Sequence, residues 1–268
     1  ASQVRFKQQQ KPEIRIHLLK LQNRDLRSIQ IIHLKDLLNL PNPYIYSLVR
    51  CMVPIYSYIQ IGIIFIVSVS LHEFAHAYAS YKLGDPTPKI QWRLTPNPIK
   101  HIDPIWFILI FLIGFGRGRP VQIDPSYYKK PYRDELIVAL AGPLTNVILG
   151  ILAIIIMMVY MKTFALGLNA LSTQTDLVIQ FWITFAMTNF ALAAFNMIPL
   201  PPLDGYRLIK VFNHNAGAFL EKNVWIISIL FLALVIFWPF KGILWEYISR
   251  VAYGLFRMLV FPFSQLFF

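Results

Sequence analysis

Long apolar segments constrain this chain more than any other feature of its sequence. Five of them approach or exceed the roughly 20 helical residues that cross the apolar layer of a bilayer. They run over Ile55–Tyr81, Leu136–Met161, Leu177–Ile198, Val224–Phe240 and Ile243–Phe263. Hydrophobic residues make up 56% of the chain and charged residues only 14%, well below the roughly 25% of a soluble domain. The sequence therefore predicts an all-helical membrane protein with about five transmembrane helices, the last of which carries a polar stripe and either crosses the bilayer or lies along its interface.

Two further segments between the predicted spans complete the expected fold. Pro104–Gly116 is apolar but too short to cross, so we expect it to dip into the membrane and return, next to protein or a wet cavity. Lys82–Asp103 is rich in proline and contains β-prone residues around Ile90–Leu94, which predicts a small β-hairpin. Val121–Ile123 is a second extended candidate. Either stretch would offer a strand edge against which a peptide could be held.

The distribution of charge separates the first fifty residues from the rest. The chain has a net charge of +12, and residues 1–50 contain nine lysines and arginines against three acidic residues. We interpret residues 1–50 as a basic extension, either a membrane-surface helix or a disordered segment, and residues 51–268 as the membrane-embedded domain. Elsewhere the basic residues lie in loops between apolar segments, which favours binding to a lipid bilayer over binding to nucleic acid.

A metal-binding pattern lies in the second half of the first apolar segment. His72 and His76 are four residues apart, with Glu73 between them. On a helix the two imidazoles lie one turn apart on one face, where they can hold one metal ion. In zinc peptidases with this HExxH pattern the histidines are ligands, and the glutamate takes the proton of the attacking water. Since Cys51 is the only cysteine, any metal must be held by histidine and carboxylate groups.

A third ligand is expected from a distant part of the chain, because catalytic zinc usually has three protein ligands and one water. The candidates are His101, His214, Asp103 and Asp204. Asp204 is the strongest of them, since it follows a predicted span and three prolines and precedes Gly205, which permits a tight turn. An Asp-Gly pair is also typical of a turn that caps the next helix, and that alternative stays open.

The two motifs together resemble the site-2 protease family of intramembrane zinc metalloproteases, in its short branch without PDZ or CBS domains. The resemblance covers about residues 55–235. It rests on His72-Glu-Phe-Ala-His76, on Asn196-x-x-Pro-x-x-Pro-Leu-Asp-Gly205, and on the shorter motifs Lys82-Leu-Gly-Asp-Pro86, Leu94-Thr-Pro-Asn-Pro98, Arg119-Pro-Val121 and Ala141-Gly-Pro-Leu-Thr-Asn146. It implies one zinc ion per chain, held by His72, His76 and Asp204, with Glu73 as the general base.

Three asparagines in or beside the spans are further candidates. We expect Asn146 to stabilise the developing oxyanion, because an amide inside an apolar span needs a role or a partner. A hydrogen bond that ties two helices together is the alternative for Asn146, and it is the interpretation we adopt for Asn189. Asn196 lies in the late motif itself and either bonds the loop of Asp204 or binds the substrate backbone. Gly142 and Pro143 should open or kink their helix near Asn146 and allow a close approach of substrate.

Together these features predict a multi-pass membrane metalloprotease that cleaves a transmembrane protein substrate in or next to a membrane segment. The basic residues Lys82, Lys89, Arg93 and Lys100 follow the first span, so the positive-inside rule places the active site on the cytoplasmic side, or the stromal side in a plastid. Two other functions fit the same ligands: a proteolytically silent membrane chaperone or scaffold, and a metal-ion transporter. The sequence leaves the substrate and the oligomeric state open.

Overall fold

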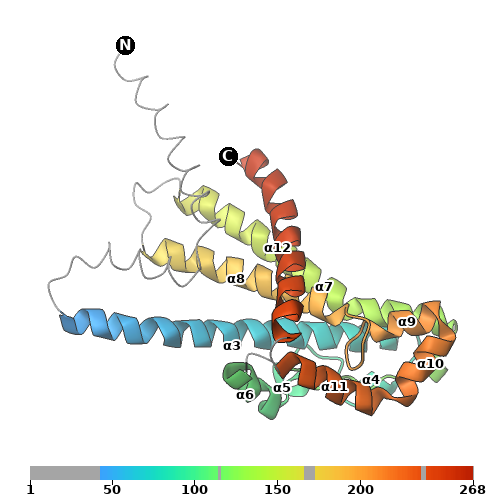
Figure 1. Ribbon diagram of the computed structural model, residues 1–268. Coiled ribbons are helices and arrows are strands. Elements are labelled where there is room, and N and C mark those ends of the chain that lie inside the picture. Colours follow the sequence, from blue (N-terminus) through green and yellow to red (C-terminus); the bar gives the residue numbers. More distant parts are fainter. Residues whose placement is uncertain (1–42, 114–115, 166–172, 237–239, 268) are drawn as a thin grey trace. The chain divides into compact units, whose positions relative to one another are not determined.

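The structure is a computed structural model of the chain, and it describes residues 43–113, 116–165, 173–236 and 240–267. Most of the basic extension expected over residues 1–50 lies outside the described residues. Residues 1–57 and 58–268 form two separate units, and the second carries the site. The helices are α3 (Pro43–Lys82), α4 (Thr87–Ile90), α5 (Pro98–His101), α6 (Pro104–Ile113), α7 (Pro131–Tyr160), α8 (Thr173–Asn196), α9 (Tyr206–Phe212), α10 (His214–Lys222), α11 (Val224–Ile236) and α12 (Phe240–Phe267) (Figure 1).

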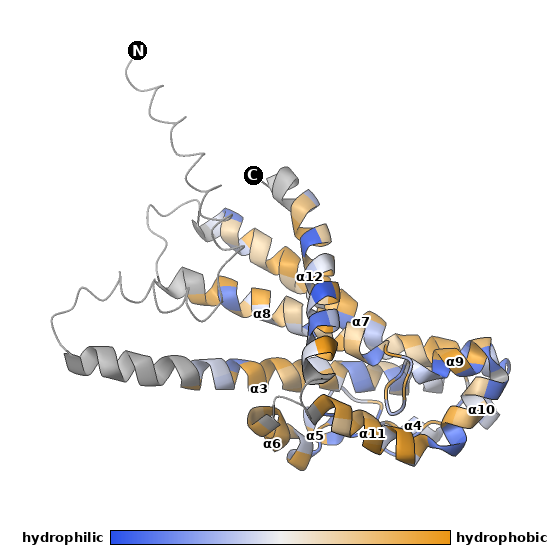
Figure 2. Ribbon diagram, viewed as in Figure 1, coloured by the Kyte–Doolittle hydropathy of each residue, from blue (hydrophilic) through white to orange (hydrophobic). Residues whose placement is uncertain are grey.

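Three helical stretches are long and apolar enough to cross a membrane. They are Ile55–Lys82 in α3, Pro131–Thr163 from the start of α7, and Leu177–Asn196 in α8. The expected spans are thus confirmed for three of the five segments. Helix α11 is apolar along its whole length (Figure 2), but it reaches spanning length only together with α10, at a bend of 78°. The count of five spans stays a prediction.

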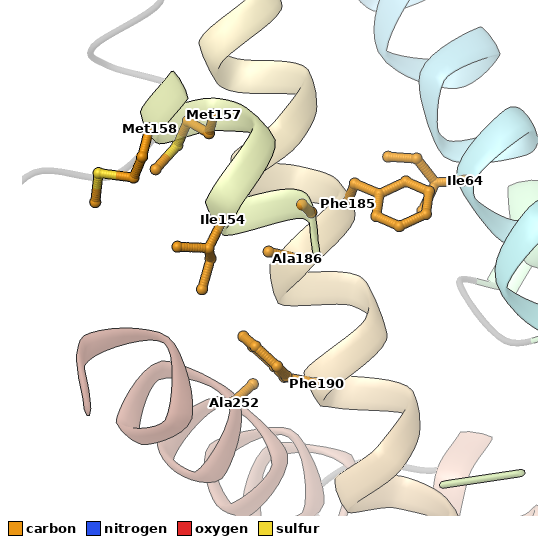
Figure 3. Close-up of a cluster of buried hydrophobic side chains, with 9 residues drawn as sticks. Ile64, Ile154, Met157, Met158, Phe185, Ala186, Phe190 and Ala252 are labelled. Carbon is orange, nitrogen blue, oxygen red and sulfur yellow. The ribbon is translucent and has the colours of Figure 1, made fainter. Parts of the chain in front are cut away.

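A buried apolar cluster holds the spanning helices together. Helices α7 and α8 pack along each other, and α12 packs against both. Figure 3 shows Ile64 of α3 beside Phe185 of α8, and Phe190 of α8 between Ile154 and Ala252. Close packing of α7 on α8 requires Gly150, because a Cβ atom there would lie 2.4 Å from the Phe190 ring. These contacts fix the three helices that carry the site.

The loop region between α3 and α7 differs from the expected hairpin. Among the described residues no β-strand forms, and the stretch Lys82–Asp103 contains the short helices α4 and α5 instead. The physical reason is that Pro88 and Pro98 lie in the first turns of these helices, where a missing amide hydrogen removes no helical bond. The extended pairing that the described residues do contain is one isolated antiparallel bridge between Ile102 and Gly118.

Helix α6 is the short apolar segment expected to enter the membrane without crossing it. Its ten residues extend about 15 Å, half the apolar thickness of a bilayer. The helix packs on α3 through Phe107 and Phe111, whose rings lie near Phe65 and Tyr58. Gly62 permits this approach, since a Cβ atom there would lie 3.2 Å from the Phe111 ring.

Asp85 connects the end of α3 to the segment that leads into α7. Its carboxylate is completely buried and accepts hydrogen bonds from the Ser80 hydroxyl at 2.7 Å, the Thr87 amide at 2.8 Å and the Asp124 amide at 2.9 Å. Burial alone would raise the pKa of Asp85, but these three bonds outweigh it and hold the pKa below its usual value. The ionised carboxylate therefore stabilises the folded loop.

We expect Asp85→Asn to lower the thermal midpoint at pH 7, because the amide places a donor where the carboxylate accepts. Since the folded-state pKa lies below the unfolded value of 3.8, the contribution of Asp85 is present above that value and is lost as the pH falls through the folded-state pKa. The difference in midpoint between the two proteins should therefore shrink in acid. Thermal unfolding in detergent, measured across pH, tests this. Glu246→Gln, which alters an exposed carboxylate, is the control, and a pH-independent difference would contradict the assignment.

Candidate metal centre

The two histidines of the first motif lie on one face of α3, as the helical spacing predicts. Their Nε2 atoms are 3.1 Å apart, and both side chains are buried. Asp204, 128 residues further along the chain, places Oδ2 3.1 Å from each of these nitrogens. Among the described residues, this is the group of histidine and acidic side chains that could hold a metal ion.

The hydrogen bonds on the far side of each imidazole determine what faces the centre. Nδ1 of His76 lies 2.7 Å from the Val138 carbonyl, and Nδ1 of His72 lies 2.6 Å from Oδ1 of Asn146. Both partners can only accept, so each Nδ1 carries the proton and each Nε2 presents a lone pair. Three electron-rich atoms then meet at 3.1 Å, an arrangement that can hold a cation between them.

The ligand set and its spacing fit zinc. Imidazole nitrogen and carboxylate oxygen are zinc ligands, and bonds of about 2.0–2.1 Å in a tetrahedron separate the ligand atoms by about 3.3 Å. Asp204 contributes a carboxylate oxygen to this set, beside the two imidazole nitrogens.

The turn after α8 aims Asp204 at the imidazoles. The Gly205 amide donates to the Asn196 carbonyl at 2.7 Å, which closes the loop on itself. A Cβ atom on Gly205 would lie 2.5 Å from the carbonyl oxygens of Met197 and Ile198, so only glycine fits this position. The alternative, in which Asp204 caps the next helix, is not met: the N-cap residue of α9 is Gly205, and no side chain makes a capping hydrogen bond there. The carboxylate of Asp204 faces the two imidazoles instead.

Glu73 lies on α3 beside the ligands but outside their triangle. Its Oε2 accepts a hydrogen bond from the Val121 amide at 3.1 Å. The segment that includes Val121 passes close to α3, because Gly118 has no side chain: a Cβ atom there would lie 2.7 Å from Val69 and 3.0 Å from Oε1 of Glu73. The proposed base is therefore held between its helix and the segment from Gly118 to Val121.

All six predicted site residues line one cavity of about 270 Å³. Polar and apolar groups share the wall, so water can enter the site, although His72 and His76 lie on an apolar helix. The other lining residues are Val69, Gly116, Arg117, Gly118, Pro120, Val121, Ile123, Leu192, Phe195, Pro202, Leu203, Tyr206, Arg207 and Val224. The six are His72, Glu73, His76, Asn146, Asn196 and Asp204.

Asn146 forms hydrogen bonds to other helices, whereas the side chain of Asn196 bonds its own helix. Asn146 is completely buried; its Oδ1 accepts from His72, and its Nδ2 donates to Asn189 at 2.8 Å. The Nδ2 of Asn196 donates to the Leu192 carbonyl of its own helix at 3.0 Å. Their roles as oxyanion donor and substrate ligand stay predictions. The sequence did not reveal that Asn146 contacts a metal ligand, because that contact joins residues 74 positions apart.

Gly142 has a larger role than the sequence indicated. A Cβ atom at this position would lie 2.4 Å from Nε2 of His76 and 2.6 Å from Nε2 of His72. The Gly-Pro pair in a span suggested a close approach to substrate, but the close approach in the structure is that of the α7 backbone to the two imidazoles. The centre is thus closed on one side by main chain.

The other candidate third ligands lie elsewhere. His101 is completely buried, and its Nε2 lies 2.7 Å from the Thr95 carbonyl, so it is a loop-bonding histidine whose pKa is lowered by burial. Asp103 accepts from the Ile105 and Trp106 amides at the start of α6. The side chain of His214 lies outside the described residues.

The family comparison agrees with this geometry. A model described as Peptidase family M50 matches residues 60–237, which is more than half of the chain and includes both motifs. The chain belongs to Peptidase family M50. This is the site-2 protease family, so the resemblance seen in the sequence is confirmed. No solved structure matches the chain significantly.

Several curated proteins are similar to this member of family M50. "Putative zinc metalloprotease YwhC" of Bacillus subtilis is 46% identical over 146 residues, which are 54% of this chain and 65% of that protein. "Putative zinc metalloprotease Rip2" of Mycolicibacterium smegmatis is 30% identical over 58% of this chain and 59% of its own length. "Zinc metalloprotease MJ0392" of Methanocaldococcus jannaschii is 27% identical over 60% of this chain and 36% of its own length. The chain thus spans less than two thirds of each relative.

Proposed function

We propose that this chain is an intramembrane zinc metalloprotease that hydrolyses a peptide bond in or next to a transmembrane segment of another membrane protein. The observation that carries the proposal is the meeting of His72, His76 and Asp204 within 3.1 Å of one another, beside Glu73 and a cavity. The relatives are named zinc metalloproteases, which supports zinc as the cofactor, one ion per chain.

Each residue of the centre has a separate role in the proposed hydrolysis. Zinc held there supplies a Lewis acid that lowers the pKa of water and polarises a carbonyl. Glu73 takes a proton from the attacking water, whose oxygen bonds to the carbonyl carbon of the substrate. Glu73 then gives that proton to the amine nitrogen as the carbon–nitrogen bond breaks. Asn146 is the proposed donor to the oxyanion and Asn196 the proposed ligand of substrate backbone.

The substrate must reach this centre as extended chain. Helical backbone hides its carbonyls in hydrogen bonds, so a transmembrane substrate has to unwind locally before its carbonyl can be attacked. The segment from Gly118 to Val121, which pairs with Ile102 through the bridge at Gly118, lines the cavity and would hold such a peptide beside Glu73. The partners we propose are therefore a transmembrane protein and the surrounding lipid bilayer.

The orientation of the site completes the proposal. Lys82, Lys89, Arg93 and Lys100 follow the first span closely, and loops rich in lysine and arginine stay on the cytoplasmic side. We therefore place the active site at the cytoplasmic face, or at the stromal face if the membrane belongs to a plastid. Accessibility of cysteines introduced into the loop after α3, probed in intact cells, tests this placement.

Cleavage of a model transmembrane substrate by the purified protein tests the function. We expect proteolysis that stops with a zinc chelator and returns when zinc is added. Zinc-dependent ion flux from liposomes without cleavage would indicate a transporter instead. Zinc binding with neither cleavage nor flux, across several unrelated substrates, would indicate a chaperone or scaffold.

A further inference from the structure

Asn189 lies in the middle of α8, with no exposed surface, and is connected to the metal centre through one other side chain. Its Oδ1 accepts a hydrogen bond from Nδ2 of Asn146 at 2.8 Å, and Oδ1 of Asn146 lies 2.6 Å from Nδ1 of His72. Nδ2 of Asn189 donates to the Ser68 hydroxyl and to the Phe185 carbonyl, both at 2.9 Å. The chain of bonds therefore leaves α3 at Ser68, crosses α8 and α7, and returns to α3 at His72.

The Phe185 carbonyl determines which group donates and which accepts in each of these hydrogen bonds. The Phe185 carbonyl can only accept, so it fixes the NH₂ side of the Asn189 amide. Oδ1 of Asn189 must then face Asn146, which in turn has to present its own NH₂ group there and its oxygen to His72. Because Oδ1 of Asn146 can only accept, Nδ1 of His72 must carry the imidazole proton. The lone pair of Nε2 is then left for the metal.

The surroundings of Asn189 keep water from replacing it. Asn189 is 0% exposed and is not among the residues that line the cavity. Figure 3 shows apolar side chains of α8, with Phe185 beside Ile64 and Phe190 next to Ile154, and Asn189 lies between Phe185 and Phe190 in the sequence. If the Asn189 amide is lost, these apolar surroundings leave Asn146 without a partner on that side.

We propose that Asn189 is a positioning residue of the metal centre, which fixes the orientation of the Asn146 amide and thereby the tautomer in which His72 binds the metal. Without Asn189, Asn146 is free to turn its NH₂ group toward His72, and the imidazole proton then moves to Nε2, where it competes with the metal. The proposal rests on the metal centre of the proposed protease and not on its substrate. Zinc affinity is measured without a substrate, so this proposal can fail while the proposed proteolytic function holds.

The first test is zinc affinity, measured in detergent by competition with a chelator. We expect Asn189→Leu, which removes both polar atoms at similar size, to weaken zinc binding about 10–100-fold, the usual cost of losing an outer partner of a ligand. Asn189→Asp should bind more nearly as the unaltered chain does, because a buried neutral carboxyl can donate to the Phe185 carbonyl and accept from Asn146. The control is Thr184→Val, since Thr184 on the same helix donates to the Gln180 carbonyl of that helix and is not part of the chain of bonds to His72.

A second measurement separates positioning from general stability. In zinc-loaded protein with ¹⁵N-labelled histidine, we expect a slowly exchanging proton on Nδ1 of His72, and we expect Asn189→Leu to shift or broaden it while Thr184→Val does not. Unchanged zinc affinity in Asn189→Leu, or an equal loss in Asn189→Asp and Asn189→Leu, would overturn the proposal. If Asn189→Leu does not fold, the absence of a proton on Nδ1 of His72 in the unaltered chain would overturn it as well.

Discussion

The Glu73→Gln protein is expected to keep its zinc and to cleave its substrate at least about 10²-fold more slowly, because a positioned general base typically contributes about 10²–10⁴-fold. Glu73 lies outside the triangle of ligand atoms, so the amide leaves the metal in place. The glutamine oxygen can still accept the hydrogen bond from the Val121 amide, so the segment from Gly118 to Val121 should stay in position. Cleavage rate and zinc content, measured on the same preparation, check both halves of this expectation.

The matched control for Glu73→Gln is Glu135→Gln. Glu135 is also a buried glutamate on a membrane helix, but it pairs with Lys210 at 3.4 Å and does not line the cavity. We expect its replacement to affect stability and to leave the cleavage rate per folded molecule near that of the unaltered chain. Chelator-sensitive proteolysis that persists in Glu73→Gln would show that another group takes the proton.

The Gly142→Ala protein is expected to lose its zinc. The added methyl group would lie 2.4 Å from Nε2 of His76 and 2.6 Å from Nε2 of His72, too close for either ring to keep its place. Because a metal held by the centre would contact both of these atoms, the site cannot adapt by moving one ring alone. Zinc content of the purified protein by mass spectrometry, with proteolysis alongside, measures the loss.

Gly150→Ala distinguishes this effect from ordinary overpacking. It adds the same methyl group two turns further along α7, 2.4 Å from the Phe190 ring and away from the ligands. Overpacking of a core costs about 1–3 kcal/mol, so we expect a lower thermal midpoint with zinc retained. If Gly142→Ala keeps its zinc, or if both variants lose zinc to the same degree, zinc binding does not depend on the close approach of α7 to the imidazoles.

Local patterns in the sequence were sufficient for the elements that depend on local chemistry. The four-residue spacing of His72 and His76 predicts one face of a helix, and the structure has it. The prolines and glycine around Asp204 predict a turn that ends α8 and redirects the chain. Apolar length predicted three helices that are long and apolar enough to cross a membrane, and the structure has them.

What the sequence did not reveal depends on contacts between distant residues. The β-prone residues around Ile90–Leu94 did not form a hairpin, because strands need a partner edge and the prolines there favour helical turns. The interpretation of Asn189 as a contact between helices is confirmed, but one sequence does not show that its partners are Asn146, 43 residues away, and Ser68, 121 residues away. The approach of Gly142 to the imidazoles likewise follows from how α7 packs on α3.

A comparison of the zinc content of the unaltered chain with that of Asp204→Ala tests the central claim most directly. Among the described residues, Asp204 is the ligand that comes from the turn after α8, while His72 and His76 lie on α3. We predict one zinc ion per unaltered chain and a large loss in Asp204→Ala. Asp103→Ala, which removes a carboxylate at the start of α6, should keep the metal. An Asp204→Ala protein that is folded and still holds one zinc ion per chain would contradict the proposed centre.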